Sequence, residues 1–320
     1  MDHRPIVHNA PQRCASIDIG TVTCRLLLAD VLDASLVELE RRCNITNLGI
    51  GVDKTGLLRD DAIDRVVFQV AEYVDVVRTY ISSDHPSIPI TAVATSAARD
   101  AQNASVLIER LRELGVELSV IPGTREAALS FRGASCGYED EHLMVVDIGG
   151  GSTEVVLGTG GEAPQFSHSF NIGCRRMTER FMAGDPPTEK ECNALRAWVR
   201  GEMTPVIVQA QAQGCSIDRI VAVAGTPTSV VAIDKHMEVY DSSRVHATEV
   251  SRETLQHIYD ELRSLPLEQR KMVVGLEPAR ASVIVSGLAI LLEVLDIVGC
   301  SSFTVSESDI LQGILLAIYA

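Results

Sequence analysis

Two segments of the chain share an uncommon pattern: an apolar run that ends in aspartate, a turn rich in glycine, serine and threonine, and a second apolar run. The first copy spans 15–28 and the second spans 143–157, with Asp18 and Asp147 at equivalent places. Apolar runs on both sides of a glycine turn predict a β-hairpin whose turn exposes backbone amides. Because the pattern recurs after about 130 residues, we expect two related halves.

The rest of the chain alternates between short apolar runs and longer amphipathic ones. Strands that alternate with helices predict an α/β fold. Further strands are predicted over 90–94, 117–121, 219–224 and 303–305. Helices are predicted over 60–80, 104–114, 126–132, 189–212, 252–262, 267–274, 279–298 and 310–319.

The length of 320 residues exceeds what one ordinary hydrophobic core fills, so we expect two domains. Glycine, serine and charged residues cluster over 133–140 and suggest a boundary there. We therefore expect one domain over 1–134 and a second over 135–320. The C-terminal helix, 309–320, could pack back towards the first domain.

The overall charge restricts the partners of such a chain. The formal net charge is −15 and aromatic residues are only 4%, which disfavours DNA binding and base-stacking surfaces. A phosphate-rich ligand would therefore need a local site that attracts anions, made of backbone amides, a few arginines and a metal ion.

The cysteines and the apolar segments indicate a cytoplasmic protein that does not enter a membrane. The eight cysteines are scattered, without a CxxC pair, as expected of reduced thiols. Segment 1–12 lacks the apolar stretch of a signal peptide. The most apolar run, 283–298, contains Glu293 and Asp296, so we expect a buried helix and no membrane span.

The second hairpin turn is the strongest candidate for a functional site. Consecutive glycines let the backbone approach a ligand, and successive amides can form an anion-binding nest. Asp147 and Glu154 could hold Mg²⁺ directly or through water. The alternative is a tight hairpin that needs glycine, with Asp147 capping its turn. The candidate phosphate-binding residues are Gly149, Gly150, Gly151, Ser152 and Thr153.

The first hairpin turn is a weaker signal by itself, because short strings of this kind are common in turns. Paired with the second copy, it suggests two loops that grip a phosphate chain from both sides of a cleft. Its candidate phosphate-binding residues are Asp18, Gly20, Thr21 and Thr23.

Three strand-to-helix junctions add candidates, because free amides at a helix start favour anions. In the first, Thr95 and Ser96 precede Arg99, whose guanidinium either binds phosphate oxygens or faces solvent. In the second, Glu126 opens a helix, either as a partner of the helix dipole or as a catalytic group. The third junction offers Gly225 and Thr226.

Taken in order, these motifs resemble those of the Ppx/GppA family of exopolyphosphatases and guanosine pentaphosphate phosphatases. The resemblance implies two actin-like (ribonuclease H-like) domains of the acetate kinase–sugar kinase–Hsp70–actin superfamily, flanking a cleft. It covers roughly 15–316 and implies the short form, without the HD-like helical domain of longer relatives. The motifs are Asp18–Gly20, Ala94–Ala97 with Arg99 and Asn103, Gly123 with Glu126, Asp147–Glu154, Gly225–Thr226 and Gly275–Arg280.

The resemblance also implies roles for single residues. Glu126 matches the catalytic glutamate that deprotonates the attacking water, and Arg99 matches a catalytic arginine that contacts phosphate. Asp147 and Glu154 match acidic residues linked to Mg²⁺, with Mn²⁺ as an alternative, and Asp147 also acts on the reacting phosphate. The two glycine turns match the two phosphate loops of the family.

The sequence departs from the family pattern at several places. Thr21-Val22-Thr23 stands where the first loop usually reads S-N-S, and Arg125 replaces an acid before Glu126. Gln312 precedes Gly313, and Ser282 follows Arg280-Ala281 where the family has R-A-D. These differences bear on substrate choice and turnover and leave Glu126 and Asp147 in place.

We therefore expect an exopolyphosphatase that hydrolyses terminal phosphate from inorganic polyphosphate in the interdomain cleft, with Mg²⁺. Three alternatives stay open: hydrolysis of guanosine pentaphosphate to the tetraphosphate, a non-catalytic binder of polyphosphate or a nucleotide, and transfer of phosphate to ADP. We also expect a homodimer, because related two-domain proteins often pair.

Overall fold

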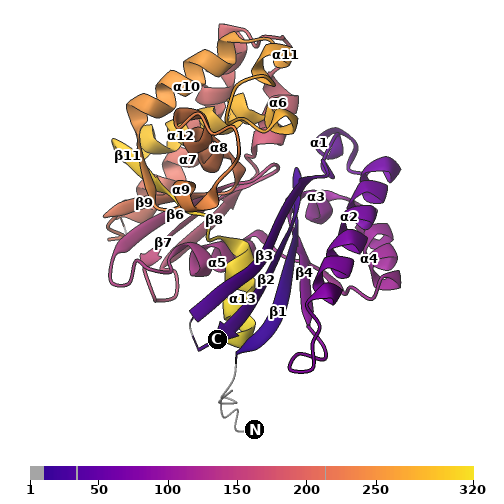
Figure 1. Ribbon diagram of the computed structural model, residues 1–320. Helices are drawn as coiled ribbons and strands as arrows, with labels where there is room; N and C mark the ends of the chain where they lie inside the picture. The colour runs from indigo at the N-terminus through magenta and orange to yellow at the C-terminus, as the bar shows by residue number, and fades with distance from the viewer. Residues whose placement is uncertain (1–10, 34, 213) are drawn as a thin grey trace.

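The computed structural model describes residues 11–33, 35–212 and 214–320. The expectation that segment 1–12 is no signal peptide falls largely outside these ranges. The strands form two mixed sheets, which lie in two lobes side by side (Figure 1).

The first sheet is built around the first predicted hairpin. Strands β1 and β2 pair antiparallel, and Asp18 lies opposite Arg25. Strand β4 pairs parallel with β1, and β5 parallel with β4. The spatial order is β3 (Ser35–Ile45), β2 (Thr23–Leu32), β1 (Gln12–Ile19), β4 (Ile90–Ala94) and β5 (Leu118–Val120).

The second sheet repeats this arrangement around the second hairpin. Strands β6 and β7 pair antiparallel, with Asp147 opposite Glu154. Strand β9 pairs parallel with β6, β11 parallel with β9, and β10 adds an antiparallel edge. The spatial order is β10 (Thr248–Ser251), β11 (Ser302–Val305), β9 (Arg219–Val223), β6 (His142–Ile148), β7 (Thr153–Thr159) and β8 (Phe166–Phe170).

The two sheets have the same topology, because β8-β7-β6-β9-β11 follows the order of β3-β2-β1-β4-β5. The α/β class and the two related, actin-like halves that the sequence predicted are therefore confirmed. Strands β1 and β6 read as continuous apolar runs because neighbouring strands flank them on both sides and helices cover their faces.

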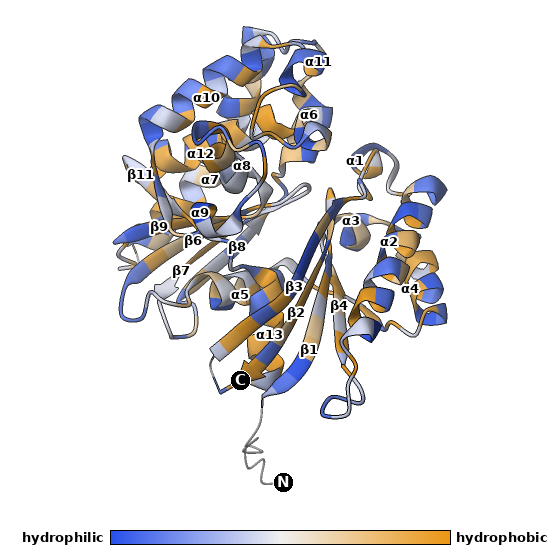
Figure 2. Ribbon diagram, viewed as in Figure 1, coloured by the Kyte–Doolittle hydropathy of each residue, from blue (hydrophilic) through white to orange (hydrophobic). Residues whose placement is uncertain are grey.

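Helices cover both sheets, with hydrophobic faces turned towards the strands and hydrophilic faces towards solvent (Figure 2). Each half has its own large core, so each buries apolar surface independently. The helices that follow the first hairpin are α1 (Val52–Thr55), α2 (Asp60–Thr79), α3 (Ser96–Asp100), α4 (Ala104–Glu113) and α5 (Gly123–Ala134). Those that follow the second are α6 (Cys174–Phe181), α7 (Glu189–Ala212), α8 (Gly225–Asp234), α9 (Ser242–Val245), α10 (Arg252–Ser264), α11 (Leu267–Arg270), the 3₁₀ turn η1 (Pro278–Arg280), α12 (Ile284–Val298) and α13 (Ile310–Tyr319).

Helices α5 and α13 cross where the two halves meet. Helix α5 contacts β6, β7 and β8 of the second sheet, whereas α13 contacts β1 and β2 of the first. A Cβ atom at Gly133 would lie 1.9 Å from the carbonyl oxygen of Asp309, and one at Gly313 would lie 1.8 Å from that of Leu129. Because each helix packs on the sheet of the other half, a single boundary after residue 134 stays a proposal.

Two predicted helices have wrong limits. The helix expected over 267–274 ends at Arg270, whose side chain turns inwards and donates to three backbone carbonyls, among them that of Ala281. The helix expected over 279–298 begins only at Ile284. The intervening segment forms turns through backbone hydrogen bonds, such as that from the Leu276 amide to the Val273 carbonyl, and one bond from Arg270 reaches it at Ala281. The local sequence pattern does not show these bonds.

Several elements were not predicted at all. Strands β3 and β8 are edge strands with many partly exposed polar residues, so they lack a long apolar run. Helix α6 is short and strongly polar. The apolar run 283–298 does form a buried helix, α12, and among the described residues no helix is both long and apolar enough to cross a lipid bilayer.

Replacing Gly313 by alanine should destabilise the protein, because its methyl group would collide with the Leu129 carbonyl. We expect a loss of about 1–3 kcal/mol in the free energy of unfolding, measured by urea titration. Gly201 in α7 is a matched control, since a Cβ there has no atom within 4 Å. Gly201→Ala should be stabilising by up to about 1 kcal/mol. Equal stability of the two variants would contradict the close crossing of α5 and α13.

Candidate active site

The two halves enclose a small pocket that most of the predicted phosphate-binding residues line. Its volume is about 60 Å³, and both hairpin turns contribute to its walls together with the starts of α3 and α8. The sequence analysis had proposed these residues from separate motifs, and the fold brings them together. The predicted residues in its lining are Asp18, Gly20, Thr21, Thr23, Thr95, Ser96, Glu126, Asp147, Gly149, Gly150, Gly151, Ser152 and Gly225.

Four predicted residues do not line this pocket. The buried hydroxyl of Thr153 donates to the backbone carbonyl of Ile172 at 2.5 Å, so it serves the local structure. Thr226 is buried within the second half. Arg99 lies outside the lining but contacts Glu126, which lines the pocket, and Glu154 is paired across the strands with Asp147. Of the departures from the family pattern, Arg125 is exposed and lies outside the lining.

In both hairpin turns, backbone carbonyl oxygens accept hydrogen bonds from a later segment of the same half. The carbonyls of residues 21–22 accept hydrogen bonds from amides within 46–49, just after β3. The carbonyls of residues 149–150 accept from the amides of 174–176, just after β8. Within the described ranges, the amides of Gly150 and Gly151 donate to no backbone carbonyl. Amides left unpaired in this way can bind an anion.

Glycine is required in the second turn because the two turns approach each other closely. A Cβ atom at Gly150 would lie 2.8 Å from the Cβ of Thr21, and one at Gly151 would lie 2.4 Å from the Ser96 hydroxyl oxygen. Larger residues there would therefore push the two halves apart. The triple glycine thus serves two needs, the approach of a ligand and the contact between halves.

Glu126 lies in the first turn of α5 and faces the pocket. Its Oε2 accepts a hydrogen bond from Arg99 Nη1 at 3.0 Å, and the same nitrogen donates to the carbonyl of Ile121 at 3.1 Å. Burial raises the pKa of Glu126 to about 7, with a further contribution from the charge of Asp147, although Arg99 opposes the rise. Glu126 can therefore exchange a proton near neutral pH.

Asp147 and Glu154 lie opposite each other on β6 and β7, and each accepts a hydrogen bond from a serine. Ser130 donates to Asp147 Oδ2 at 2.6 Å, and Ser169 donates to Glu154 Oε1 at 2.7 Å. Burial raises the pKa of Asp147 to about 6 and raises that of Glu154 well above its usual range, helped by the neighbouring carboxylates. The negative charge here is thus incompletely compensated.

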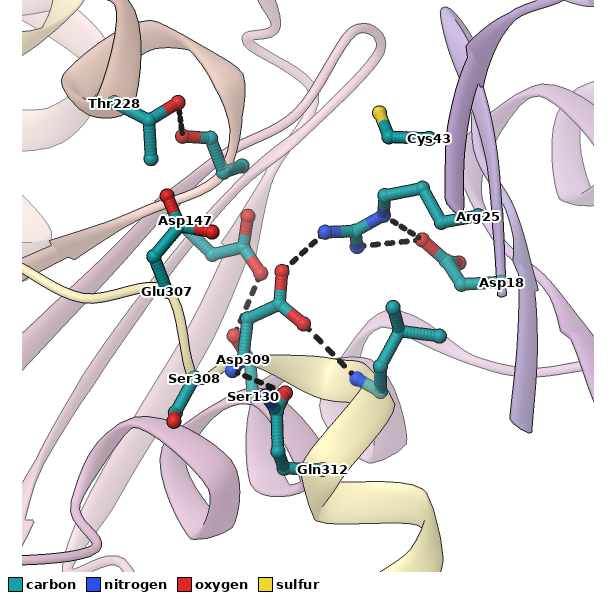
Figure 3. A network of polar contacts seen from close by, with 12 residues as sticks. Asp18, Arg25, Cys43, Ser130, Asp147, Thr228, Glu307, Ser308, Asp309 and Gln312 are labelled. Carbon is teal, nitrogen blue, oxygen red and sulfur yellow. Dashed lines mark hydrogen bonds and ion pairs between the residues drawn. The ribbon is translucent and has the colours of Figure 1, made fainter. Parts of the chain in front are cut away.

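Arg25 connects the two halves at the floor of the site (Figure 3). Its Nη2 and Nε donate to Asp18 at 2.6 and 3.1 Å, and its Nη1 pairs with Asp309, which caps the start of α13. Burial raises the pKa of Asp18 even so, because Arg25 opposes that effect only in part. The sequence analysis missed Arg25; an arginine facing an aspartate across a predicted apolar hairpin was the signal that could have revealed it.

The carboxylates of the site suit a hard cation such as Mg²⁺. Oδ1 of Asp18 and Oε2 of Glu154 are buried and lack a hydrogen-bond partner among the described residues. Oxygen ligands and uncompensated negative charge are what Mg²⁺ selects, and it usually keeps several waters and substrate oxygens in its shell. Among the described residues, no three or more histidine, cysteine, aspartate or glutamate side chains are grouped so that they could hold a metal ion.

A larger groove opens from the small pocket. Its volume is about 1070 Å³, and it shares Arg25, Gly225 and Arg280 with the pocket. The Arg280 guanidinium lies directly over Gly225, where any Cβ atom would overlap it. The preceding Ala224 has φ of 72°, a strained conformation for a residue with a side chain, as is often found at functional sites.

Comparisons with known proteins find similar sequences and structures. The Ppx/GppA phosphatase family model matches residues 27–319. Exopolyphosphatase 2 of Mycobacterium tuberculosis is 35% identical over 323 residues, which cover 96% of this chain and 98% of that protein. Guanosine-5'-triphosphate,3'-diphosphate pyrophosphatase of Photobacterium profundum is 26% identical over 307 residues, which cover 94% of this chain and 58% of that protein. The crystal structure of the Aquifex aeolicus member of the Ppx/GppA family has a TM-score of 0.79 and 32% identity, covering 96% and 97% of the two chains.

Replacing Asp147 by asparagine should raise the melting temperature at pH 8 in a buffer with a chelator. The folded-state pKa of Asp147 lies above its unfolded value, so stability is lost as the pH rises from about 4 to about 6, and the full cost of the charge is present at pH 8. The gain should be about 2–4 °C for each kcal/mol relieved and should shrink towards pH 4.5. Asp75→Asn, on the exposed surface of α2, is the control and should show no such pH dependence. A pH-independent gain in Asp147→Asn would refute this explanation.

Proposed function

Because the chain belongs to the Ppx/GppA phosphatase family, whose members hydrolyse phosphoanhydride bonds, we propose that it is an exopolyphosphatase. In this proposal the terminal phosphate of inorganic polyphosphate binds in the small pocket and is released by water. The observation that supports it most is the buried Glu126, with its raised pKa, in a pocket that both glycine turns line.

The terminal phosphate would be held by donors from both halves. Amides of the second turn and hydroxyls of Thr21, Ser96 and Ser152 line the pocket, and such donors suit phosphate oxygens. Arg25 and Arg280 stand where the pocket meets the groove and could hold the next phosphates of the chain. A chain with a net charge of −15 repels phosphate overall, so binding would depend on these local donors.

Glu126 would act as the general base. Water is a poor nucleophile, and a carboxylate placed beside it can take its proton as the bond to phosphorus forms. Arg99 favours the ionised form of Glu126 and holds its position through the hydrogen bond of 3.0 Å. The proton on Glu126 would then leave to solvent or to the phosphate product.

Asp147 and Glu154 would hold Mg²⁺, or Mn²⁺ in its place. When bound, the ion would neutralise charge on the phosphate oxygens. Asp18 lines the same pocket, and its Oδ1 lacks a hydrogen-bond partner among the described residues, so it could contribute through water. Ser130 and Ser169 would orient the two ligand carboxylates.

The groove supports one alternative substrate of the same reaction. Its volume of about 1070 Å³ is close to the upper end of the range for small-molecule pockets, so guanosine pentaphosphate could place its guanosine there. A non-catalytic binder of polyphosphate or a nucleotide, and a phosphotransferase acting on ADP, are further outcomes of the same assay. Phosphate release should be measured with polyphosphates of several lengths, guanosine pentaphosphate and ATP, each with Mg²⁺ or Mn²⁺.

The homodimer and the cytoplasmic location are also proposals. All eight cysteines are free thiols, as suits a reducing compartment. Sedimentation velocity would test the homodimer, and fractionation of cells would test the location.

Replacing Glu126 by glutamine should lower the rate of phosphate release by about 10²- to 10⁴-fold, because the base is lost while size and hydrogen bonding are kept. The measurement is kcat with polyphosphate under saturating Mg²⁺. Glu109→Gln, on the exposed face of α4, is the control and should keep the wild-type rate. Wild-type turnover in Glu126→Gln would exclude the proposed mechanism.

Replacing Arg99 by glutamine should shift the acid side of the pH–rate profile to higher pH. The base must be ionised, and Arg99 lowers the pKa of Glu126, so its loss raises that pKa further above 7. The profile of kcat/KM from pH 5 to 9 measures the shift. Arg110→Gln removes a comparable surface pair with Asp64 and should leave the profile unchanged. A shift to lower pH in Arg99→Gln would contradict this role.

A further inference from the structure

Helix α6 begins at the second glycine turn and is bound tightly to it. The amides of residues 174–176 donate to the carbonyls of Gly149 and Gly150 at 2.9–3.1 Å. Gly173, just before the helix, lies so close that a Cβ atom there would be 2.4 Å from the Gly150 carbonyl carbon. A displacement of α6 therefore displaces the amides that face the pocket.

Arg176 extends from the start of α6 to the first half of the protein. Its Nε donates to the carbonyl of Gly151 at 2.7 Å, within its own half. Its Nη1 pairs with Asp53 of α1, and its Nη2 pairs with Asp100 at the end of α3. Nη2 also lies 3.4 Å from the hydroxyl of Ser96, which lines the pocket. One guanidinium thus binds the glycine turn and two carboxylates of the other half.

Two neighbours of Arg176 on α6 also contact the first half of the protein. Arg175 donates to the side-chain oxygen of Asn47, and the carboxylate of Glu179 accepts from the amide of Gly51 at 3.3 Å. All these partners belong to the first half and lie on the side where α1 and α6 face each other (Figure 1). The Arg176 side chain is the best connected of the three and is only 15% exposed.

We propose that Arg176 is a positioning residue that holds the two halves closed over the phosphate pocket. The Arg176 latch consists of Arg176, Asp53 and Asp100. When it is formed, the glycine turn of the second half is held against Thr21 and Ser96 of the first, and the donors of both halves converge on one phosphate. This inference rests on the proposed function only for its effect on catalysis, because closure itself is a property of the fold.

The latch is a switchable element because of its charge and exposure. Asp53 and Asp100 are 38% and 31% exposed, so salt should weaken their pairing with Arg176. Opening the latch breaks only the pairs with Asp53 and Asp100, and Arg176 keeps its bond to the Gly151 carbonyl within its own half. The glycine turn would therefore move away from Thr21 and Ser96 together with α6. Small misplacements of such groups are costly in phosphoryl transfer, which depends mainly on positioning.

Small-angle X-ray scattering and kinetics of the full-length chain test the latch. Arg176→Gln should raise the radius of gyration and lower kcat for polyphosphate by about 10- to 100-fold. High salt should expand the wild-type protein and leave the variant unchanged, and inorganic phosphate should contract the wild-type protein more than the variant. Arg176→Lys should restore part of kcat, because it keeps the charge but not the fork that binds several partners.

Arg180→Gln is the matched control on the same helix. The Arg180 guanidinium stacks on Trp198 of the second half, 3.8 Å from its ring centroid, so its loss should change neither the scattering nor kcat. The variant Asp53→Asn with Asp100→Asn removes the same pairs from the other half. Its effect should match that of Arg176→Gln, and adding Arg176→Gln should change little more, as expected of coupled residues.

Two results would overturn the proposal. The first is an unchanged radius of gyration in Arg176→Gln, whatever happens to kcat, since Arg176 would then act on the glycine turn alone. The second is a combined variant, with Arg176→Gln and both aspartate substitutions, in which kcat falls by the full product of the two separate losses. Should Arg176→Gln fail to fold, the double asparagine variant gives the same scattering test. Because scattering needs no substrate, it tests the latch even if polyphosphate is not hydrolysed.

Discussion

The site depends on a crowding of buried carboxylates that the protein itself does not fully neutralise. Glu126, Asp147 and Glu154 share one buried space, and Arg99 reaches only the first of them directly. Their pKa values rise because burial and mutual repulsion disfavour the charged forms. This arrangement lowers the stability of the empty fold at neutral pH. It also leaves carboxylates of the kind that suit a divalent cation, which we propose the site binds, and a group that can exchange a proton near pH 7.

The same architecture occurs in both halves and places the two glycine turns in one pocket with Asp18, Glu126 and Asp147. In each half a third strand leads into a segment that ties back the carbonyls of the hairpin turn, so that the turn's amides are left for the cleft. In the second half this segment is the start of α6, and α6 also reaches the first half through Arg176. In the mechanism we propose, the binding of phosphate and the closure of the cleft are connected through α6.

Sequence patterns predicted the parts of the fold that are stabilised locally. The two hairpins, the inner strands and helices such as α7 and α13 have continuous apolar or amphipathic patterns, and their predicted limits agree closely with the structure. The edge strands β3 and β8 were missed because their polar residues face solvent, and a strand of this kind is defined by its neighbour. The segment after α11 was mispredicted because backbone turns and a hydrogen bond from Arg270 to the Ala281 carbonyl replace a helix there.

The sequence by itself determined the two glycine turns, the acids next to them, the α/β class and, through its motifs, the family. Those features depend on residues close together in the chain, where spacing alone limits the backbone. Only the tertiary structure decided the proton affinity of Glu126, the bridging place of Arg25 and the contacts of Arg176 across the cleft. Each of these depends on burial or on charges contributed by distant segments. The pattern of neighbouring residues in the sequence shows neither the burial nor the distant charges.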